Sequence, residues 1–477
     1  MIFFFLSIIW RGIFIIEVES FGERVGHSSI FVGTKLYFFG GIQMNSFCSD
    51  EVFYLDVSKT FNIASPPWVD LTATAKMPFG SSMTTMSLIY INNEPIIYLF
   101  GGLMKDPITN KDLFISNVHT FNANTLEWKI PNINGKAPER RRNMQGVFDD
   151  TGKFYIFSGA SDDYLGAGLP FKYFREILIL DTTNSIWSYG STLNIPNKRE
   201  GYSATILKNG IIVYIGGQEE TEENISQTVD INRIDLYDTK LDIWTVMIAK
   251  STSFMDSRFF QSAVLTPDEN IIIYGGRNLA GKAEPSIAVL NTRENPFEWI
   301  VPTISSNVGR VIPTSGHTAN LIGNYMIVVF GNITELYSPD KVYNSRMYIM
   351  DIRNFTWVDT FEAIQTTQEA QSTKSSKNTR IKIIIEVTGG VIDFKNFSVK
   401  SIFMIMLLVF MVLENPENII DNSLHGDLSE VIRNFNEMNT KESENNFNTK
   451  ETESLNNQFE NNFNTKEIES FLRIILI

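Results

Sequence analysis

A short motif recurs six times along the chain and constrains its fold more than any other feature of the sequence. In each copy an aromatic or aliphatic run ends in a pair of residues that is usually Gly-Gly. The copies are KLYFFGG (35–41), IIYLFGG (96–102), KFYIFSG (153–159), IIVYIGG (211–217), NIIIYGG (270–276) and MIVVFGN (326–332). The first residues of the terminal pairs fall at positions 40, 101, 158, 216, 275 and 331, so the steps are 61, 57, 58, 59 and 56 residues. A period of this length indicates a β-propeller or a solenoid.

Each repeat contains four parts in the same order. A run of small residues comes first, as in GHSSIFV at residues 26–32, and the glycine-terminated run follows it. The third part is an alternating strand that ends in Asp or Asn, at Asp56, Asn122, Asp181, Asp238, Asn291 and Asp351. The fourth part is a tryptophan, at Trp68, Trp128, Trp187, Trp244, Trp299 and Trp357. The full glycine pairs are Gly40 and Gly41, Gly101 and Gly102, Gly216 and Gly217, and Gly275 and Gly276.

These residue types favour stacked β-sheets for physical reasons. A glycine pair after a strand permits positive φ or a close backbone approach, so the chain can leave the sheet and a neighbouring sheet can pack against it. Asp and Asn close tight turns through side-chain hydrogen bonds. Tryptophan supplies a large flat ring that fills the wedge between neighbouring sheets. The repeat therefore predicts an all-β fold of stacked four-stranded sheets.

In order and spacing these parts resemble the kelch repeat family. The resemblance covers residues 20–361, about 70% of the chain. Kelch repeats imply one four-stranded blade each, so six copies imply a closed six-bladed β-propeller, similar in outline to the central domain of galactose oxidase. Ser158 and Asn332 depart from the pattern, because each replaces a glycine of its pair.

The segments outside the repeats differ in composition. Residues 1–19 form an apolar leader, interpreted either as a degraded signal or anchor or as a hydrophobic strand packed on the body. Residues 362–400 read as a polar linker with one further strand at 381–392. Residues 401–413 are an apolar helix of about 20 Å, which is either a membrane segment or a buried or interfacial helix. Residues 414–477 are an acidic, Asn-rich tail, expected to be disordered or a solvated helix, with a coiled-coil arm as the alternative.

Charge and segment order bear on the location of the protein. The net charge of -14 argues against non-specific binding to nucleic acid, which needs clustered Lys and Arg. The order of segments resembles fungal-type kelch membrane proteins, which implies an outside propeller. Arg380, Lys382, Lys395 and Lys400 precede the apolar run, however, and the positive-inside tendency would keep the propeller cytoplasmic. We therefore expect membrane association, with a cytoplasmic location as the alternative. The sequence does not indicate on which side of the membrane the propeller would lie.

The sequence offers two enzymatic alternatives. A galactose-oxidase type of copper centre would need a cysteine cross-linked to a tyrosine and copper-binding histidines, but the chain has the single cysteine Cys48 and only four histidines. These are His27, His119, His317 and His425, and their positions form no such constellation. Glu417, Asp421 and His425 resemble the iron-site pattern of kelch-type nitrile specifier proteins, yet they follow the apolar segment, and a solvated helix face also explains them. We expect no enzymatic activity, cofactor or metal.

Arginine recurs at the start of the small-residue run. Aligning RVGHS (24–28), RNMQG (142–146), REGYS (199–203) and RFFQS (258–262) gives one shared position, occupied by Arg24, Arg142, Arg199 and Arg258. One hypothesis makes these arginines struts that bond carbonyls or acids and hold blades together. The other makes them a ring near the channel mouth that binds an anion, because guanidinium groups capture carboxylates bidentately and a ring of them focuses positive potential.

The expected function is a non-enzymatic kelch-propeller scaffold for protein–protein interaction. On the anion-ring hypothesis its partner is an acidic peptide or loop. The alternatives are a metal-dependent enzyme of the galactose-oxidase or nitrile-specifier type and a glycan-binding module. The oligomeric state stays open.

Overall fold

The computed structural model describes residues 21–363 except 114–115, 164, 167–168, 170, 222–224 and 336–341. All described residues belong to one unit, Met1–Ala370. The expected leader, apolar helix and tail lie outside the described residues, as does the linker beyond residue 363. Within the described part, α1 (Thr72–Ala75) is the one helix. No helix there is long and apolar enough to cross a membrane.

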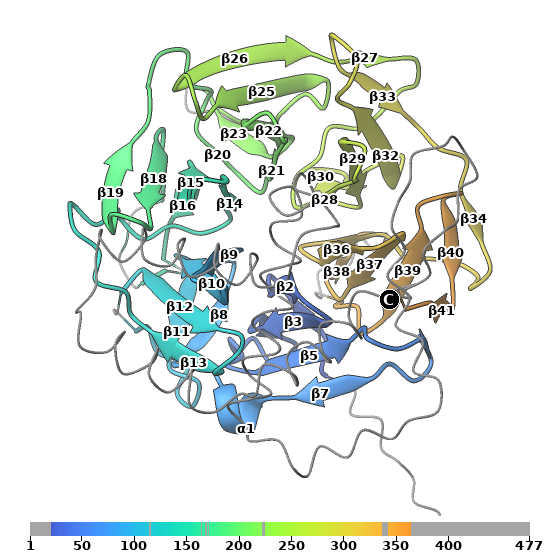
Figure 1. Cartoon of the computed structure of the whole chain (residues 1–477). Helices are drawn as coiled ribbons and strands as arrows, with labels where there is room; N and C mark the ends of the chain where they lie inside the picture. The colour runs from blue at the N-terminus through green and yellow to red at the C-terminus, as the bar shows by residue number, and fades with distance from the viewer. Residues whose placement is uncertain are drawn as a thin grey trace, which may run out of the picture. The chain divides into compact units, whose positions relative to one another are not determined.

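Six large sheets, called blades 1 to 6 here in chain order, surround a common centre (Figure 1). Blade 1 contains β2 (Ser28–Val32), β3 (Lys35–Phe39), β5 (Val52–Asp56) and β7 (Trp68–Asp70). Blade 2 contains β9 (Thr85–Ile91), β10 (Glu94–Phe100), β12 (Val118–Asn122) and β13 (Glu127–Lys129). Blade 3 contains β14 (Gly146–Phe148), β15 (Lys153–Phe157), β18 (Ile177–Asp181) and β19 (Ile186–Tyr189).

The other three blades repeat the same antiparallel order from the inner to the outer strand. Blade 4 contains β21 (Ser203–Ile206), β22 (Ile211–Ile215), β25 (Arg233–Asp238) and β26 (Ile243–Ile248). Blade 5 contains β28 (Ser262–Leu265), β29 (Asn270–Tyr274), β32 (Ile287–Asn291) and β33 (Glu298–Ile300). Blade 6 contains β36 (Thr318–Ile322), β37 (Tyr325–Val329), β39 (Met347–Asp351) and β40 (Thr356–Val358).

The inner strands close the six blades into a ring. Each inner strand contacts the inner strands of both neighbouring blades, and β36 of blade 6 contacts β2 of blade 1. At this junction the Gly26 N–H donates to the carbonyl of Gly316 at 3.0 Å, and β41 (Thr360–Phe361) pairs with β6 (Phe61–Asn62). The predicted all-β propeller of four-stranded blades is confirmed.

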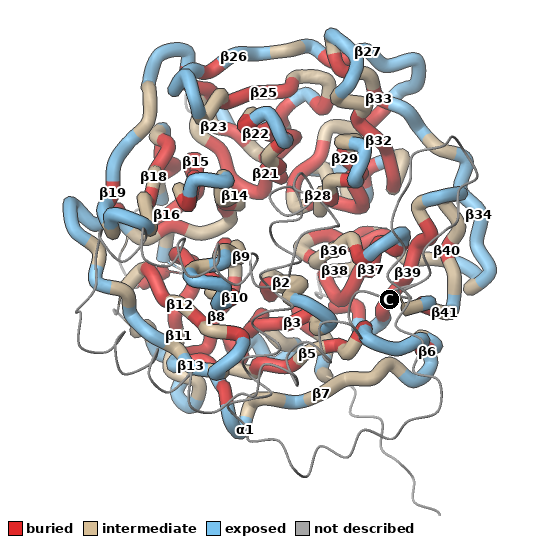
Figure 2. The backbone as a smooth tube through the Cα atoms, in the orientation of Figure 1, coloured by how far each residue is buried: buried red, intermediate tan, exposed pale blue. Residues whose placement is uncertain are grey.

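Aromatic rings fill the wedge between neighbouring blades, as the tryptophan pattern predicted. Where the second strand of a blade ends in an aromatic residue, the tryptophan of the following blade packs against it; in blade 4 the strand ends in Ile215, which lies in one apolar cluster with Trp299. Ring centroids are 5.8 Å apart for Trp128 and Phe39, and 4.9 Å apart for Trp244 and Phe157. Because both faces of each sheet are covered in this way, the second strands are buried almost throughout, and exposure concentrates on outer strands and loops (Figure 2).

Side-chain turns close the outer hairpins. The Asp56 carboxylate accepts from the Ser58 N–H at 2.9 Å, and the Asp238 carboxylate accepts from the Lys240 N–H at 2.9 Å. The acids and amides that end the third strands therefore act as predicted, by closing the turn that leads to the tryptophan strand.

One end of the ring carries the connections between second and third strands, and we call it the loop face. It comprises residues 40–51, 101–117, 158–176, 216–232, 275–286 and 330–346, as far as the structure describes them, together with the segments that precede the inner strands. Each connection pairs with the segment that precedes the inner strand of the same blade. The paired segments include β1 (Arg24–Val25) with β4 (Ile42–Gln43), β8 (Gly80–Ser82) with β11 (Leu103–Lys105), β20 (Arg199–Glu200) with β23 (Gln218–Glu220), and β35 (Thr314–Ser315) with β38 (Asn332–Ile333).

Candidate functional site

One backbone hydrogen bond recurs at every junction between blades and fixes which residues are equivalent. The N–H of the second residue of each glycine pair donates to a carbonyl of the following blade. The bonds are Gly41 to Ser81, Gly102 to Arg141, Gly159 to Arg199, Gly217 to Arg258, Gly276 to Thr314 and Gly331 to Arg24, with N···O distances from 2.7 to 3.0 Å. The shared position is therefore occupied by Arg24, Ser81, Arg141, Arg199, Arg258 and Thr314. The predicted Arg142 was wrong by one residue.

The arginines at this position are struts inside the blades. Arg24 donates from Nη1 to the carbonyl of Gly40 at 2.9 Å and from Nη2 to the Glu51 carboxylate at 2.6 Å. Arg141 repeats both contacts, with the carbonyl of Ser158 at 3.2 Å and the Glu176 carboxylate at 2.6 Å. Each guanidinium thus ties the end of the second strand to the start of the third.

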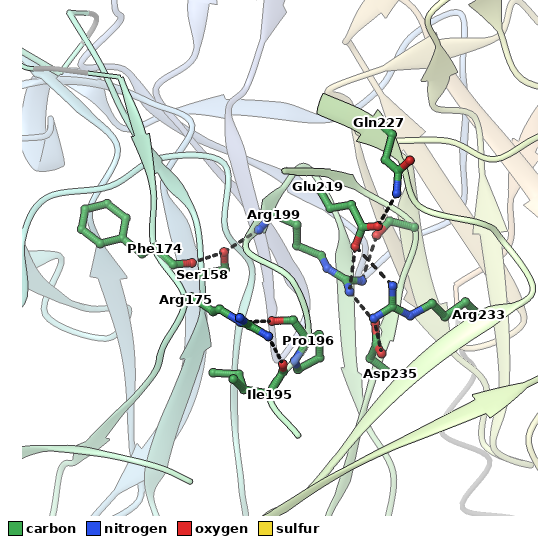
Figure 3. Close-up of polar contacts among 11 residues, drawn as sticks. Ser158, Phe174, Arg175, Ile195, Pro196, Arg199, Glu219, Gln227, Arg233 and Asp235 are labelled. Atoms are coloured by element: carbon green, nitrogen blue, oxygen red, sulfur yellow. Dashed lines mark hydrogen bonds and ion pairs between the residues drawn. The ribbon is translucent and has the colours of Figure 1, made fainter. Parts of the chain in front are cut away.

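Blade 4 contains the densest version of the strut (Figure 3). Arg199 is ion-paired with Asp235, and its Nη2 lies 3.8 Å from the Glu219 carboxylate. Arg233 adds a second cation, 3.3 Å from Glu219 and 3.3 Å from the other oxygen of Asp235. The Arg199 and Asp235 side chains are both 0% exposed, so this pair is enclosed by protein on all sides.

Arg258 in blade 5 has only carbonyl partners. Its guanidinium donates to Gly275 at 3.1 Å, Pro285 at 2.8 Å and Glu284 at 3.0 Å. Burial lowers the pKa of Arg258 to about 10, because no carboxylate bonds it directly to offset the loss of solvent. For Arg24, burial also lowers the pKa, and Glu51 opposes that shift.

This geometry fits the part of the strut hypothesis in which the arginines bond carbonyls and acids, and it does not fit the anion ring. The side-chain partners of the arginines at the shared position lie in the same blade, so these guanidinium groups brace single blades and do not hold neighbouring blades together. Arg24, Arg199 and Arg258 are 0% exposed, so their guanidinium groups offer a ligand no surface. Arg142 does lie on the loop face with an 11% exposed side chain, but it is ion-paired with Asp162 and Glu200. The four predicted arginines therefore do not form one accessible ring.

The sixth glycine pair was also shifted by one residue. Its two positions are filled by Phe330 and Gly331, with φ of 61° and 95°, whereas Gly331 and Asn332 were predicted. The Phe330 ring lies 5.3 Å from the Arg24 guanidinium and 5.2 Å from the His27 ring, so packing across the closing junction holds a bulky residue in a left-handed conformation.

In the third pair, Ser158 takes the first position with φ of 55°. Its hydroxyl donates to the carbonyl of Phe174 at 2.6 Å and accepts from the Arg199 N–H at 2.7 Å (Figure 3). The two hydrogen bonds explain why serine is accepted there in place of glycine.

Exposed apolar side chains mark the loop face, and the repeat pattern did not predict them. Every second-to-third connection of blades 1 to 5 exposes at least one large apolar residue. These residues are Met44, Phe47, Ile108, Phe171, Ile225 and Leu279, and we call them the loop tips. Ile108 is the most exposed of them, at 85%. The only signal in the sequence is an isolated apolar residue inside a polar loop, as in DPITN at residues 106–110.

The charges around the loop tips are largely paired with one another. Lys105 pairs with Asp112, and Arg142 pairs with Asp162 and Glu200. Three further pairs on this face are Lys198 with Glu220 at 2.8 Å, Lys282 with Glu284 at 2.7 Å, and Arg310 with Glu335 at 2.6 Å. The described part of the loop face therefore presents apolar tips among compensated charges rather than a field of one sign.

A family model described as Attractin/LZTR1 beta-propeller matches residues 2–284, which is more than half of the chain. The chain belongs to the Attractin/LZTR1 β-propeller family. Kelch domain-containing protein 3 of Rattus norvegicus is 28% identical over 242 residues, covering 48% of this chain and 58% of that protein. The chain thus spans little more than half the length of these curated relatives.

Two further similarities were found. The N-(sulfonatooxy)prop-2-enimidothioate sulfolyase of Thlaspi arvense is 24% identical over 261 residues, covering 53% of this chain and 70% of that protein. Among solved structures, YjhT covers 70% of this chain and 97% of its own, with 14% identity and a TM-score of 0.49. The relatives of this kelch-type propeller therefore include a protein named as an enzyme.

Among the described residues of this kelch-type propeller, His27, His119, His317 and Cys48 are buried. His27 Nε2 lies 2.9 Å from the Thr318 hydroxyl and His317 Nε2 lies 2.8 Å from the Ser262 hydroxyl, so both rings link neighbouring inner strands. Burial raises the pKa of the Cys48 thiol to about 11. The described residues contain no group of three or more His, Cys, Asp or Glu side chains placed to hold a metal ion.

The nitrile-specifier-type residues are not placed by the structure. Glu417, Asp421 and His425 lie outside the described residues, so the second enzymatic alternative stays a prediction.

Proposed function

We propose that this kelch-type propeller is a non-enzymatic scaffold that binds another protein on its loop face. The observation that carries the proposal is the set of loop tips, with large apolar side chains exposed on five successive blades. Large apolar and aromatic side chains at an interface supply most of its binding energy when a partner encloses them. Loops mounted on a rigid scaffold are the usual place for such contacts.

The junctions beneath the loops support this proposal by making their bases rigid. Both residues of each glycine pair have positive φ, and the second residue is hydrogen-bonded to the next blade. A Cβ atom on Gly101 would lie 2.5 Å from the carbonyl of Arg141, so the blades approach as closely as glycine allows. A preorganised loop base reduces the entropy that binding costs.

The proposed partner is recognised by apolar contact rather than by its negative charge. The hypothesis of an acidic peptide depended on an open ring of arginines, and three of the four guanidinium groups are enclosed in blades. Several other charges of the described loop face form ion pairs within the face, among them Arg142 with Glu200, Lys198 with Glu220 and Arg310 with Glu335. We therefore propose a partner segment that presents apolar side chains to the loop tips.

Capture of partners by the full-length chain tests this proposal. Proximity labelling or affinity capture should yield a protein whose recovery falls at least tenfold when Ile108 and Phe171 are both replaced by serine. The matched control is Tyr90→Ser with Ile130→Ser, which removes two exposed apolar residues that do not belong to the loop tips. Unchanged recovery with the loop-tip variant, or equal loss with both variants, would contradict the proposal.

A metal-dependent enzyme is the second candidate, favoured by the similarity to the Thlaspi arvense protein named as a sulfolyase. Elemental analysis of the purified full-length chain separates it from the scaffold. Stoichiometric iron that is lost with Glu417→Gln would support the enzyme, whereas binding to a glycan array would indicate the glycan-binding alternative. Membrane association through residues 401–413 stays a separate prediction.

A further inference from the structure

The outer strand of blade 4 has a free backbone edge. With six residues, β26 is the longest outer strand, since the others have three or four. In blades 5 and 6 the outer strand is covered by a parallel segment, β27 (Lys250–Ser251) on β33 and β34 (Ser305–Ser306) on β40. Within the part of the chain that the structure describes, no strand pairs with the outer side of β26, which lies on the perimeter of the ring (Figure 1).

The free stretch of this edge runs from Thr245 to Ile248. At its start, the carbonyl of Ser191 accepts a hydrogen bond from the Trp244 indole at 3.0 Å, so the preceding chain covers that end. Beyond its end, the Ala249 N–H donates inward to the carbonyl of Asn232 at 2.8 Å. Because successive residues of a strand point their backbone groups to opposite sides, the N–H and C=O groups of Val246 and Ile248 point outward.

The side chains of β26 do nothing to prevent strand pairing. The strand reads IWTVMI, without a charged residue or proline. Charges and prolines are the usual devices that keep an edge strand from pairing with another chain. Val246 is 53% exposed and Ile248 is 61% exposed. The apolar surface continues along the neighbouring outer segments through Leu193, Leu241, Phe254, Ile300, Val301 and Ile304.

We propose that this edge binds a second copy of the chain, by antiparallel pairing of β26 with β26 about a two-fold axis. The charges that flank the strand favour this arrangement, since Asp242 precedes it and Lys250 follows it. Asp242 Oδ1 accepts from the Ser191 N–H and the Tyr237 hydroxyl, which leaves its Oδ2 for a contact with the second copy. Antiparallel pairing brings Asp242 of one copy toward Lys250 of the other at both ends, whereas parallel pairing would bring like charges together. A two-fold axis also makes the apolar perimeter of one copy face the same perimeter of the other.

This dimer leaves the loop face open. The loop tips lie on the connections between second and third strands, whereas β26 is an outer strand on the perimeter of the ring. Each dimer would therefore present two loop faces, and two weak contacts to a repeated or oligomeric partner would reinforce one another. The inference does not depend on the proposed function, since self-pairing can occur whether or not the loop tips bind a protein.

Sedimentation equilibrium of the full-length chain tests the pairing. We expect a dimer at about 100 µM, a concentration at which an interface with a Kd of about 10 µM is mostly associated. Val246→Lys combined with Ile248→Lys should give a monomer with an unchanged unfolding transition, while the control Ile108→Lys should remain dimeric. A monomeric wild type, or a dimeric double variant, would overturn the proposal.

Oxidative cross-linking provides an independent measurement. The single cysteine, Cys48, is buried, so an introduced cysteine is the only accessible thiol. Among single cysteine variants at positions 245–248, those nearest the axis should form disulfide-linked dimers, whereas Ile108→Cys should not. Absence of cross-linking at all four positions would overturn the proposal. A third outcome is a wild-type chain that is monomeric but carries a co-purified protein, which the Val246→Lys and Ile248→Lys double variant loses. That outcome would assign the edge to the co-purified protein and would also overturn the proposed dimer.

Discussion

Replacing Arg199 by methionine should destabilise the propeller. Partner binding by the folded fraction should not change. Methionine keeps an apolar stem of similar length but removes the cation from a pair whose two side chains are 0% exposed. Asp235 would keep only Arg233, at 3.3 Å, and Glu219 would lose its second cation. Breaking a buried ion pair by removing one partner costs about 3 to 5 kcal/mol, so the free energy of unfolding should fall by about that amount.

Urea unfolding followed by tryptophan fluorescence measures this loss. The control is Arg293→Met, because Arg293 lies 3.7 Å from Asp268 and both side chains are more than half exposed. An exposed pair contributes about 0 to 1 kcal/mol. Combining Arg199→Met with Asp235→Leu should recover part of the loss, since no charge is then buried without its partner. If Arg199→Met unfolds like the wild type but no longer captures a partner, the guanidinium serves a ligand and the strut argument is refuted.

Two further predictions concern the stability of the propeller. Gly216→Ala should lower the free energy of unfolding by about 1 to 3 kcal/mol more than Gly33→Ala. Both glycines have φ near +60°, but only at Gly216 would the new Cβ lie close to a carbonyl oxygen, 2.5 Å from that of Arg258. Equal urea midpoints for the two variants would contradict this prediction. Burial lowers the pKa of His119 from 6.5 to about 4, with Arg140 adding to the shift. As the pH falls below about 6.5 the unfolded chain binds protons before the folded chain does, so the free energy of unfolding falls between pH 6.5 and 4, and His119→Gln should flatten that dependence; an unchanged slope would show that His119 contributes nothing to it.

The parts of the fold that depend on local chemistry could be predicted from the sequence. The glycine pairs, the turn acids and the tryptophans each have a reason within one blade or its immediate neighbour, and six copies made the period plain. Where identical residues stand side by side, the same reasoning misplaced the register. Arg140, Arg141 and Arg142 are chemically alike, and only the hydrogen bond from the Gly102 N–H to the Arg141 carbonyl identifies the repeat position.

Burial of the arginines could not be predicted for a similar reason. The partners of Arg24 are Gly40 and Glu51, which lie 16 and 27 residues further along the chain. The segment RVGHS (24–28) gives no indication that a carboxylate before the third strand will bond the Arg24 guanidinium. Phe330 is a parallel case, because its positive φ is stabilised by contact with Arg24 across the closing junction and not by any property of phenylalanine.

Charged and apolar side chains at the loop face have exchanged their usual positions relative to solvent. Guanidinium groups are enclosed beneath it, whereas isoleucine, phenylalanine and leucine side chains stand exposed on its loops. The two sets act on different quantities. A buried strut stabilises its own blade whether or not a partner is present. An exposed loop tip contributes little to the free energy of unfolding, since it is solvated in both the folded and the unfolded state. Variants of the struts should thus change stability at unchanged partner selectivity, and variants of the loop tips should change capture at unchanged stability. A loop-tip variant that unfolds several kcal/mol more easily would mean that these side chains pack within the ring, and the binding face would have to be sought elsewhere on the propeller.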